Sequence, residues 1–262
     1  MSSIYWATFA SVGKSPHGIL PTDTYERGFA MSMYSERLLP MIGRTAAAIE
    51  QTPHMQDILH GTMPEERFRY QIRQNYQYLM DYTRCWAVGL SRARSFSEMF
   101  DWYKIVKNTM EKTVIPNRDN WAKKLGMSME EIDGVIMAPG KRSYTSHELA
   151  RAMEGDLASC MMALFPCNVI YWFMGQHLVP QCTLPKENMC REWLEFYISP
   201  EYVEKCRNEI RMVDELCEGK PEKELDRLQE IFAVGCNYEL LQWRDMYYNM
   251  EEWPMMDLFP KR

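Results

Sequence analysis

This chain of 262 residues has no excess of positive charge, no linker and no repeat. These absences argue against nucleic-acid binding and against a division into several domains. Its 30 Lys and Arg are outnumbered by 36 Asp and Glu, so no basic stripe is available to neutralise phosphates. Nucleic acid is therefore not an expected partner. Gly and Pro number only 13 and 14, and no stretch rich in Gly, Ser or Pro divides the chain. We therefore predict a single domain over residues 1–262.

The eight cysteines lack the spacing of a metal site or of a disulfide framework. No two of them form a Cys-x-x-Cys pair, and no histidine accompanies them at the spacing of a zinc site. We expect free thiols in a reducing compartment and no bound metal. Residues 1–18 lack the charged segment, apolar core and cleavage site of a secretory signal, which favours a cytoplasmic protein.

Only one stretch approaches the length of a membrane span. Residues 157–185 contain no charged residue, and residues 157–175 are the most apolar part. Pro166 and Asn168 interrupt this stretch, and the other helical segments are amphipathic. We therefore expect the central buried helix of a bundle, with a membrane span as the less favoured alternative.

Helical periodicity runs through nearly the whole chain, and no segment shows strand-like alternation. This predicts an all-α, multi-helix bundle. The expected helices are 23–38, 41–49, 62–90, 97–112, 146–153, 156–178, 185–198, 200–217 and 222–250. Breaks are predicted at Pro40 and Pro116, because proline lacks the amide hydrogen that a helix interior needs.

Glu239 stands on the face of the last helix that should be dry. The residues three, four and seven positions away are nearly all apolar or small: Phe232, Gly235, Cys236, Gln242, Trp243 and Met246. Burial disfavours an ionised carboxylate and raises its pKa toward neutrality, where it can donate or accept a proton. Glu239 is therefore either a catalytic acid or a core glutamate hydrogen-bonded to a Tyr or Trp.

Cys167 is the candidate nucleophile in the uncharged stretch. It follows Pro166, whose missing hydrogen bond should loosen the turn and give a ligand room to approach. Cys160 and Tyr171 lie on the same helical face as Cys167. The alternative is an inert buried thiol, which is the more common role of such a residue.

Three further polar side chains could serve a binding site. Asn75 and Tyr78 stand three residues apart on an earlier helix, where they either join helices by hydrogen bonds or face a ligand. Tyr144 lies at an expected helix start, with Ser146 or its neighbour as the cap and His147 next to it.

Taken in order, these residues form a pattern of spaced blocks. The blocks are Phe68-x5-Gln74-Asn75-x2-Tyr78, Ser143-Tyr144-Thr145-Ser146-His147, Phe165-Pro166-Cys167-x3-Tyr171, Trp193-x3-Tyr197 and Tyr238-Glu239-x3-Trp243-x3-Tyr247, followed by Trp253. This pattern resembles the TenA/thiaminase II family over residues 50–254, after an N-terminal extension and first helices in residues 1–50. The resemblance implies a haem-oxygenase-like fold and a homo-oligomer, either a tetramer or a dimer, without a cofactor.

The resemblance also implies an activity in thiamin salvage. The expected reaction is hydrolysis of 4-amino-5-aminomethyl-2-methylpyrimidine to the hydroxymethylpyrimidine with release of ammonia, and more slowly the cleavage of thiamin. Cys167 would add to the pyrimidine ring while Glu239 protonates a ring nitrogen. The implied substrate-binding residues are Asn75, Tyr78, Tyr144, Tyr171 and Tyr197.

Two positions depart from the family pattern. Asn75 stands where the family usually has Asp, and Gln242 stands where it often has an aromatic residue. An amide can still bind the edge of an aminopyrimidine but supplies no negative charge, so slower turnover or a different substrate is expected.

Two alternatives to this hydrolase stay open. One is a non-catalytic or divergent family member that binds a small ring compound and acts as a regulator or scaffold. The other is different chemistry on the same fold, as in oxidases related to pyrroloquinoline-quinone synthesis or di-iron carboxylate proteins. The di-iron proteins need Glu-x-x-His pairs, which none of the five histidines forms.

Overall fold

The structure, a computed structural model, describes residues 32–260. Over this range the chain folds into helices without strands, which confirms the all-α prediction. The part of the predicted first helix that precedes residue 32 lies outside the described residues. The single domain over residues 1–262 stays a prediction for the same reason.

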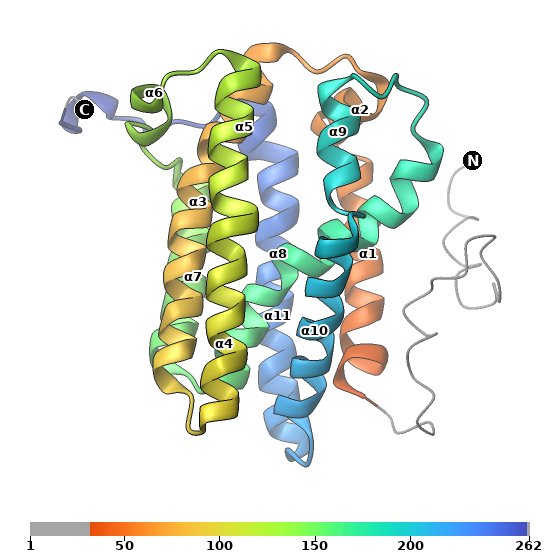
Figure 1. The fold of residues 1–262 in the computed structure, drawn as a ribbon, viewed down its shortest axis with the longest axis vertical. Helices are drawn as coiled ribbons and strands as arrows, with labels where there is room; N and C mark the ends of the chain where they lie inside the picture. The colour runs from red at the N-terminus through yellow and green to blue at the C-terminus, as the bar shows by residue number, and fades with distance from the viewer. Residues whose placement is uncertain (1–31, 261–262) are drawn as a thin grey trace. The chain divides into compact units, whose positions relative to one another are not determined.

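The main helices lie side by side in a bundle (Figure 1). The α-helices are α1 (Leu39–Glu50), α2 (Pro53–His60), α3 (Glu65–Arg92), α4 (Phe96–Thr109), α5 (Ile115–Leu125), α6 (Met129–Asp133), α7 (Pro139–Glu154), α8 (Leu157–Leu178), α9 (Met189–Phe196), α10 (Pro200–Cys217), α11 (Glu222–Leu241) and α12 (Tyr247–Asn249). Short π-helical segments are η3 (Met33–Leu38), η4 (Met110–Val114) and η6 (Gln242–Met246), and 3-10 turns are η5 (Val179–Gln181) and η7 (Met256–Leu258).

Helix α8 crosses the middle of the bundle obliquely (Figure 1) and contacts α1, α3, α7, α10 and α11. Asp156 caps its amino end, since its Oδ1 accepts a hydrogen bond from the Ser159 amide at 2.9 Å. By length and composition this helix could span a membrane, but 83% of its apolar window is buried by the other helices. It is therefore the buried central helix that the sequence predicts.

Helices α8 and α11 meet at a glycine. The ring of Pro166 packs on Gly235, and a Cβ at position 235 would lie only 2.6 Å from Pro166 Cγ. Helix α8 continues through Pro166 without a break. The proline that was expected to loosen α8 therefore packs against α11. Pro166 directly precedes Cys167 on α8, and Gly235 lies one turn before Glu239 on α11.

The predicted breaks at Pro40 and Pro116 are wrong. Each proline lies in the first turn of an α-helix, and a π-helical segment that ends two residues earlier joins this helix without a gap. The wider π-helical turn leaves space for the proline ring. It also changes which backbone carbonyls of the preceding turn accept hydrogen bonds, so the amide hydrogen that proline lacks does not end the helix.

The predicted helix start at Ser146 is also wrong. Helix α7 begins at Pro139, which suits the first turn because its fixed φ is helical and its amide has no intrahelical partner there. Tyr144 and His147 therefore lie inside α7. The inner face of this helix carries Lys141, Tyr144, Thr145 and Glu148, all of which are buried.

Candidate active site

A pocket of about 340 Å³ opens between α3, α5, α8 and α9. Four of the seven predicted site residues line it: Asn75, Cys167, Tyr171 and Tyr197. They come from α3, α8 and the end of α9, so the fold brings together residues that are more than one hundred positions apart. Cys167 is half-buried, because one side of it faces this pocket.

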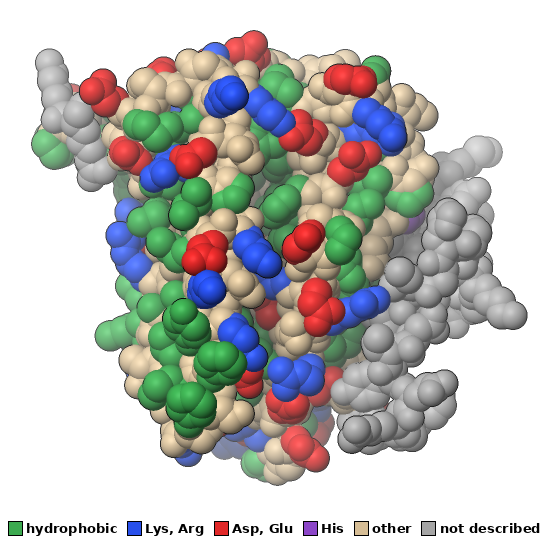
Figure 2. Space-filling view, in the orientation of Figure 1, with side chains coloured by type: hydrophobic (Ala, Val, Ile, Leu, Met, Phe, Trp, Pro, Cys, Tyr) green, Lys and Arg blue, Asp and Glu red, His purple; other side chains and the backbone are tan. Residues whose placement is uncertain are grey.

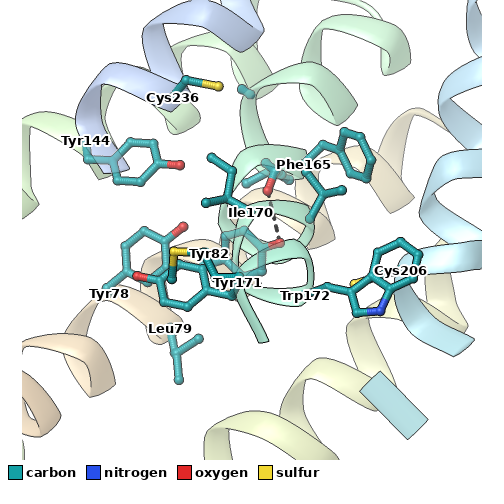
Figure 3. Close-up of a cluster of buried hydrophobic side chains, with 14 of the residues drawn as sticks. Tyr78, Leu79, Tyr82, Tyr144, Phe165, Ile170, Tyr171, Trp172, Cys206 and Cys236 are labelled. Atoms are coloured by element: carbon teal, nitrogen blue, oxygen red, sulfur yellow. Dashed lines mark hydrogen bonds between the residues drawn. The ribbon is translucent and has the colours of Figure 1, made fainter. Parts of the chain in front are cut away.

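The other three predicted residues, Tyr78, Tyr144 and Glu239, are no more than 1% exposed. The rings of Tyr78 and Tyr144 stack with their centroids 5.5 Å apart. The Tyr78 ring also stacks on the Tyr82 ring with centroids 5.5 Å apart, and Figure 3 shows these tyrosines in one buried cluster. These three residues thus form an inner layer on the buried side of the site.

Glu239 is the acidic group of this inner layer. Burial raises the pKa of its carboxyl group to about 6, against the opposing effects of Lys141 and of the hydroxyl groups of Tyr144 and Tyr171. Its Oε2 atom is buried without a hydrogen-bond partner among the described residues. Glu239 can therefore donate or accept a proton near neutral pH and has one oxygen left for a ligand.

Cys167 lies within range of the negative charge of Glu239. Burial raises the pKa of the Cys167 thiol well above its usual value, and the negative charge of Glu239 raises it further. The Tyr78 hydroxyl and the charge of Lys141 act in the opposite direction. Cys167 is therefore a neutral thiol at rest, and its thiolate forms only as another group takes up the proton.

Asn75 is half-buried on α3, one turn before Tyr78, and its side chain lines the pocket. Asn117 on α5 lines the same pocket, and its Oδ1 is buried without a partner in the described part of the chain. Amide groups in such positions can donate to and accept from the edge of a heterocycle. Sequence reasoning did not identify Asn117, because nothing in its neighbourhood marks a pocket.

Aromatic rings form the wall beside the carboxyl end of α9. The centroid of the Tyr197 ring lies 4.9 Å from those of Tyr171 and Trp193. The Trp243 indole, on η6, donates a hydrogen bond to Tyr171 Oη at 3.2 Å. The wall is therefore rigid, and it is suited to stacking on a flat ring.

Two buried charged residues of α7, Lys141 and Glu148, were missed by the sequence predictions. Tyr78 Oη donates a hydrogen bond to Glu148 Oε1 at 2.7 Å. Lys141 Nζ donates one to Gln242 Oε1. Lys141 lies three residues before Tyr144, and Glu148 lies four residues after it. A prediction that α7 begins at Pro139 would therefore have placed both on the inner face of the helix with Tyr144. Among the residues that the structure describes, no three His, Cys, Asp or Glu are grouped as in a metal site.

Known proteins are similar to this chain in sequence and in fold. A profile of the TENA/THI-4/PQQC family matches residues 46–250. The aminopyrimidine aminohydrolase of Halalkalibacterium halodurans is 31% identical over 201 residues, which cover 77% of this chain and 89% of that protein. The aminopyrimidine aminohydrolase of Bacillus subtilis is 28% identical over 201 residues, covering 77% and 84%.

Solved structures of TenA proteins have the same fold as this chain. A TenA homologue from P. horikoshii OT3 superposes with a TM-score of 0.73 at 23% identity and covers 83% of this chain and 99% of its own. A TenA family transcription regulator from Silicibacter sp. TM1040 also has a TM-score of 0.73, at 21% identity, covering 82% and 97%. The predicted haem-oxygenase-like fold is thereby confirmed.

Proposed function

This chain belongs to the TENA/THI-4/PQQC family, and we propose that it is a thiamin-salvage hydrolase acting on 4-amino-5-aminomethyl-2-methylpyrimidine. A hydrolase of the TenA class is supported by the relatives named aminopyrimidine aminohydrolase. The observation that carries the proposed reaction is the proximity of a pocket-facing thiol, Cys167, to a buried acid, Glu239.

The proposed reaction begins with addition to the ring. The thiol of Cys167 passes its proton to the aminomethyl nitrogen and the sulfur bonds to the unsubstituted ring carbon, while Glu239 delivers a proton to the adjacent ring nitrogen. The electrons gained by the ring then expel the protonated amine as ammonia from the exocyclic methylene. Water adds its oxygen to this methylene and gives one proton to the departing sulfur, the ring nitrogen returns its proton to Glu239, and the ring becomes aromatic again. Thiamin would react in the same way, with its thiazole as the leaving group.

The pocket residues bind and orient the ring in this proposal. Tyr171 and Tyr197 supply the aromatic wall on which a pyrimidine can stack. Asn75 donates to a ring nitrogen and accepts from the amino group, as an amide does with adenine. Tyr78 and Tyr144 hold the inner side of the site, next to the sulfur and the carboxyl group. No cofactor is needed for this chemistry.

The test is direct incubation of the protein with the aminomethylpyrimidine, with ammonia and hydroxymethylpyrimidine measured over time. We expect both products in equal amounts from the wild-type protein and a rate at least about a thousandfold lower from Cys167→Ser. Cys182→Ser is the matched control, since Cys182 is also half-buried but does not line the pocket. Activity that survives Cys167→Ser would remove the nucleophile from the mechanism.

A non-catalytic regulator is the second candidate. Asn75 favours it, because a pocket without a negative charge at this position binds an aminopyrimidine but stabilises a protonated ring less well. A related structure is also named as a transcription regulator. Calorimetric binding of the pyrimidine without any release of ammonia would support this candidate over the hydrolase.

We further propose that the protein is a cytoplasmic homo-oligomer, either a tetramer or a dimer. Four exposed side chains on α4 support self-association: Phe96, Met99, Phe100 and Tyr103. Phe96 alone is 83% exposed, and Figure 2 shows hydrophobic side chains gathered over this part of the surface. Patches of this kind often mark protein interfaces.

A further inference from the structure

Lys141 is the one lysine among the fully buried polar side chains of the described residues, with 1% of its surface exposed. A buried ammonium group is costly unless nearby groups compensate its charge. Among the described residues it forms no ion pair within 4.0 Å. Burial lowers the pKa of Lys141 to about 8, so the ammonium group keeps most of its charge at neutral pH and loses it in more alkaline solution.

Three neighbours fix the position of this ammonium group. Nζ donates a hydrogen bond to Oε1 of Gln242, which follows Glu239 by three residues and so lies one turn beyond it. Nζ also lies 4.3 Å from the centroid of the Tyr78 ring and 5.2 Å from that of Tyr247. The ammonium group is thus placed between the turn that carries Glu239 and the tyrosine beside Cys167.

Charged and titratable groups face Lys141 from its own helix and from four further elements. Glu239 on α11 acts on the pKa of Lys141 most strongly, followed by Cys167 on α8 and by Glu148 on α7, the helix of Lys141 itself. The rings of Tyr78 on α3 and Tyr247 on α12 cover the ammonium group. The influence is mutual. Lys141 is the main group that opposes the rise in the pKa of Glu239, and it also lowers the pKa of Cys167.

We propose that Lys141 is a positioning residue of the active site, whose ammonium group, held by Gln242, is the counter-ion of Glu239 and of the thiolate that forms at Cys167. The role of Lys141 in catalysis rests on the proposed function. The effect of Lys141 on the Cys167 thiol is independent of that function, because the ammonium group stabilises the thiolate whether or not a substrate is bound. Gln242 has a role here that an aromatic residue at this position could not fill, since it supplies the amide oxygen that accepts the lysine hydrogen bond.

The experiment measures the rate of alkylation of Cys167 by iodoacetamide at about pH 7, where Lys141 is still charged, by mass spectrometry of the Cys167 peptide. The variants are Lys141→Met, which removes the charge, and Lys141→Arg, which keeps it. Lys123→Met is the control, because Lys123 is exposed on α5. Removing an opposite charge at close range raises the pKa of a thiol by about 1 unit or more. The alkylation rate of Lys141→Met at neutral pH should therefore fall about tenfold, with Lys141→Arg close to wild type.

An alkylation rate of Lys141→Met at neutral pH equal to that of the wild-type protein would overturn the proposal. Gln242→Leu provides a second variant if Lys141→Met does not fold by circular dichroism. It leaves the lysine in place but removes its acceptor, so the alkylation rate should fall by a smaller factor, and an unchanged rate would again overturn the proposal. The same proteins are assayed for kcat and KM with the aminomethylpyrimidine, where Lys141→Met should lower kcat and change KM little.

The two readouts separate this proposal from the function on which it rests. Slower alkylation of Lys141→Met, together with a wild-type protein that releases no ammonia, would reject the hydrolase and keep the role of Lys141. Normal hydrolysis by the wild-type protein, together with an unchanged alkylation rate of Lys141→Met, would reject the role of Lys141 and keep the hydrolase.

Discussion

Replacing Gly235 with alanine would test whether the contact between α8 and α11 sets the geometry of the active site. Gly235 lies one turn before Glu239, and Pro166 directly precedes Cys167. An added Cβ would lie 2.6 Å from Pro166 Cγ, and a proline ring within a helix cannot rotate away. Nonbonded carbons prefer about 3.5–4.0 Å, so the two helices must separate by about 1 Å.

The expected changes follow from two opposing effects. Alanine favours a helix over glycine by about 1 kcal/mol, whereas overpacking in a core costs about 1–3 kcal/mol. The free energy of unfolding of Gly235→Ala should therefore fall by about 0–2 kcal/mol. A shift of about 1 Å between catalytic groups should lower kcat about a hundredfold.

Gly43→Ala is the matched control on α1. A Cβ at Gly43 would meet only Phe173 Cζ at 3.7 Å, an ordinary contact. This variant should gain about 0.4–1 kcal/mol of stability and keep the wild-type kcat. Urea unfolding followed by circular dichroism and the rate of ammonia release measure both quantities. The reasoning would be refuted if the two variants were equally stable and equally active.

Three further results are expected. Asn75→Asp should raise kcat about tenfold, because a charge-assisted hydrogen bond is about 1.4 kcal/mol stronger than a neutral one. If the pyrimidine binds neither the wild-type protein nor Asn75→Asp with a Kd below about 1 mM, Asn75 does not contact the ring. Burial raises the pKa of Glu239 from 4.5 to about 6, so the folded protein binds this proton more tightly than the unfolded chain and loses about 2 kcal/mol of stability as the pH rises through this window. Urea unfolding across that range should show the loss in wild type relative to Glu239→Gln, and an equal pH dependence in both proteins would argue against a buried carboxyl group. Phe100→Glu on α4 should dissociate the proposed oligomer in size-exclusion chromatography with light scattering, whereas Asn108→Glu, a charged substitution at another exposed position of α4, should not. An oligomer that survives Phe100→Glu would have its interface elsewhere.

Local periodicity was sufficient to predict the burial of Glu239. Its neighbours at helical spacing are apolar or small, and the side chain is 1% exposed. The proximity of Cys167 to Glu239 could not be predicted in this way. It depends on α8 and α11 packing at Pro166 and Gly235, a contact between residues 69 positions apart, and the resemblance to a family supplied that expectation.

The errors of sequence prediction have identifiable physical causes. Proline was assumed to end helices at Pro40 and Pro116, but a π-helical segment precedes each and accommodates the ring. The start of α7 was placed at Ser146 because serine is a common cap, although Pro139 begins the helix. That error concealed the inner face of α7 and with it Lys141, the residue on which the further inference depends.

A double-mutant cycle between Cys167 and Glu239 tests most directly whether the thiol and the acid act in one step. The quantity to measure is kcat/KM for the aminomethylpyrimidine in the wild-type protein, Cys167→Ser, Glu239→Gln and the double variant. If the two groups act together, each single variant loses at least about a thousandfold and the double variant loses no more than the worse of the two. Losses that multiply in the double variant would show that Cys167 and Glu239 contribute independently, and a fully active Glu239→Gln would remove the acid from the reaction.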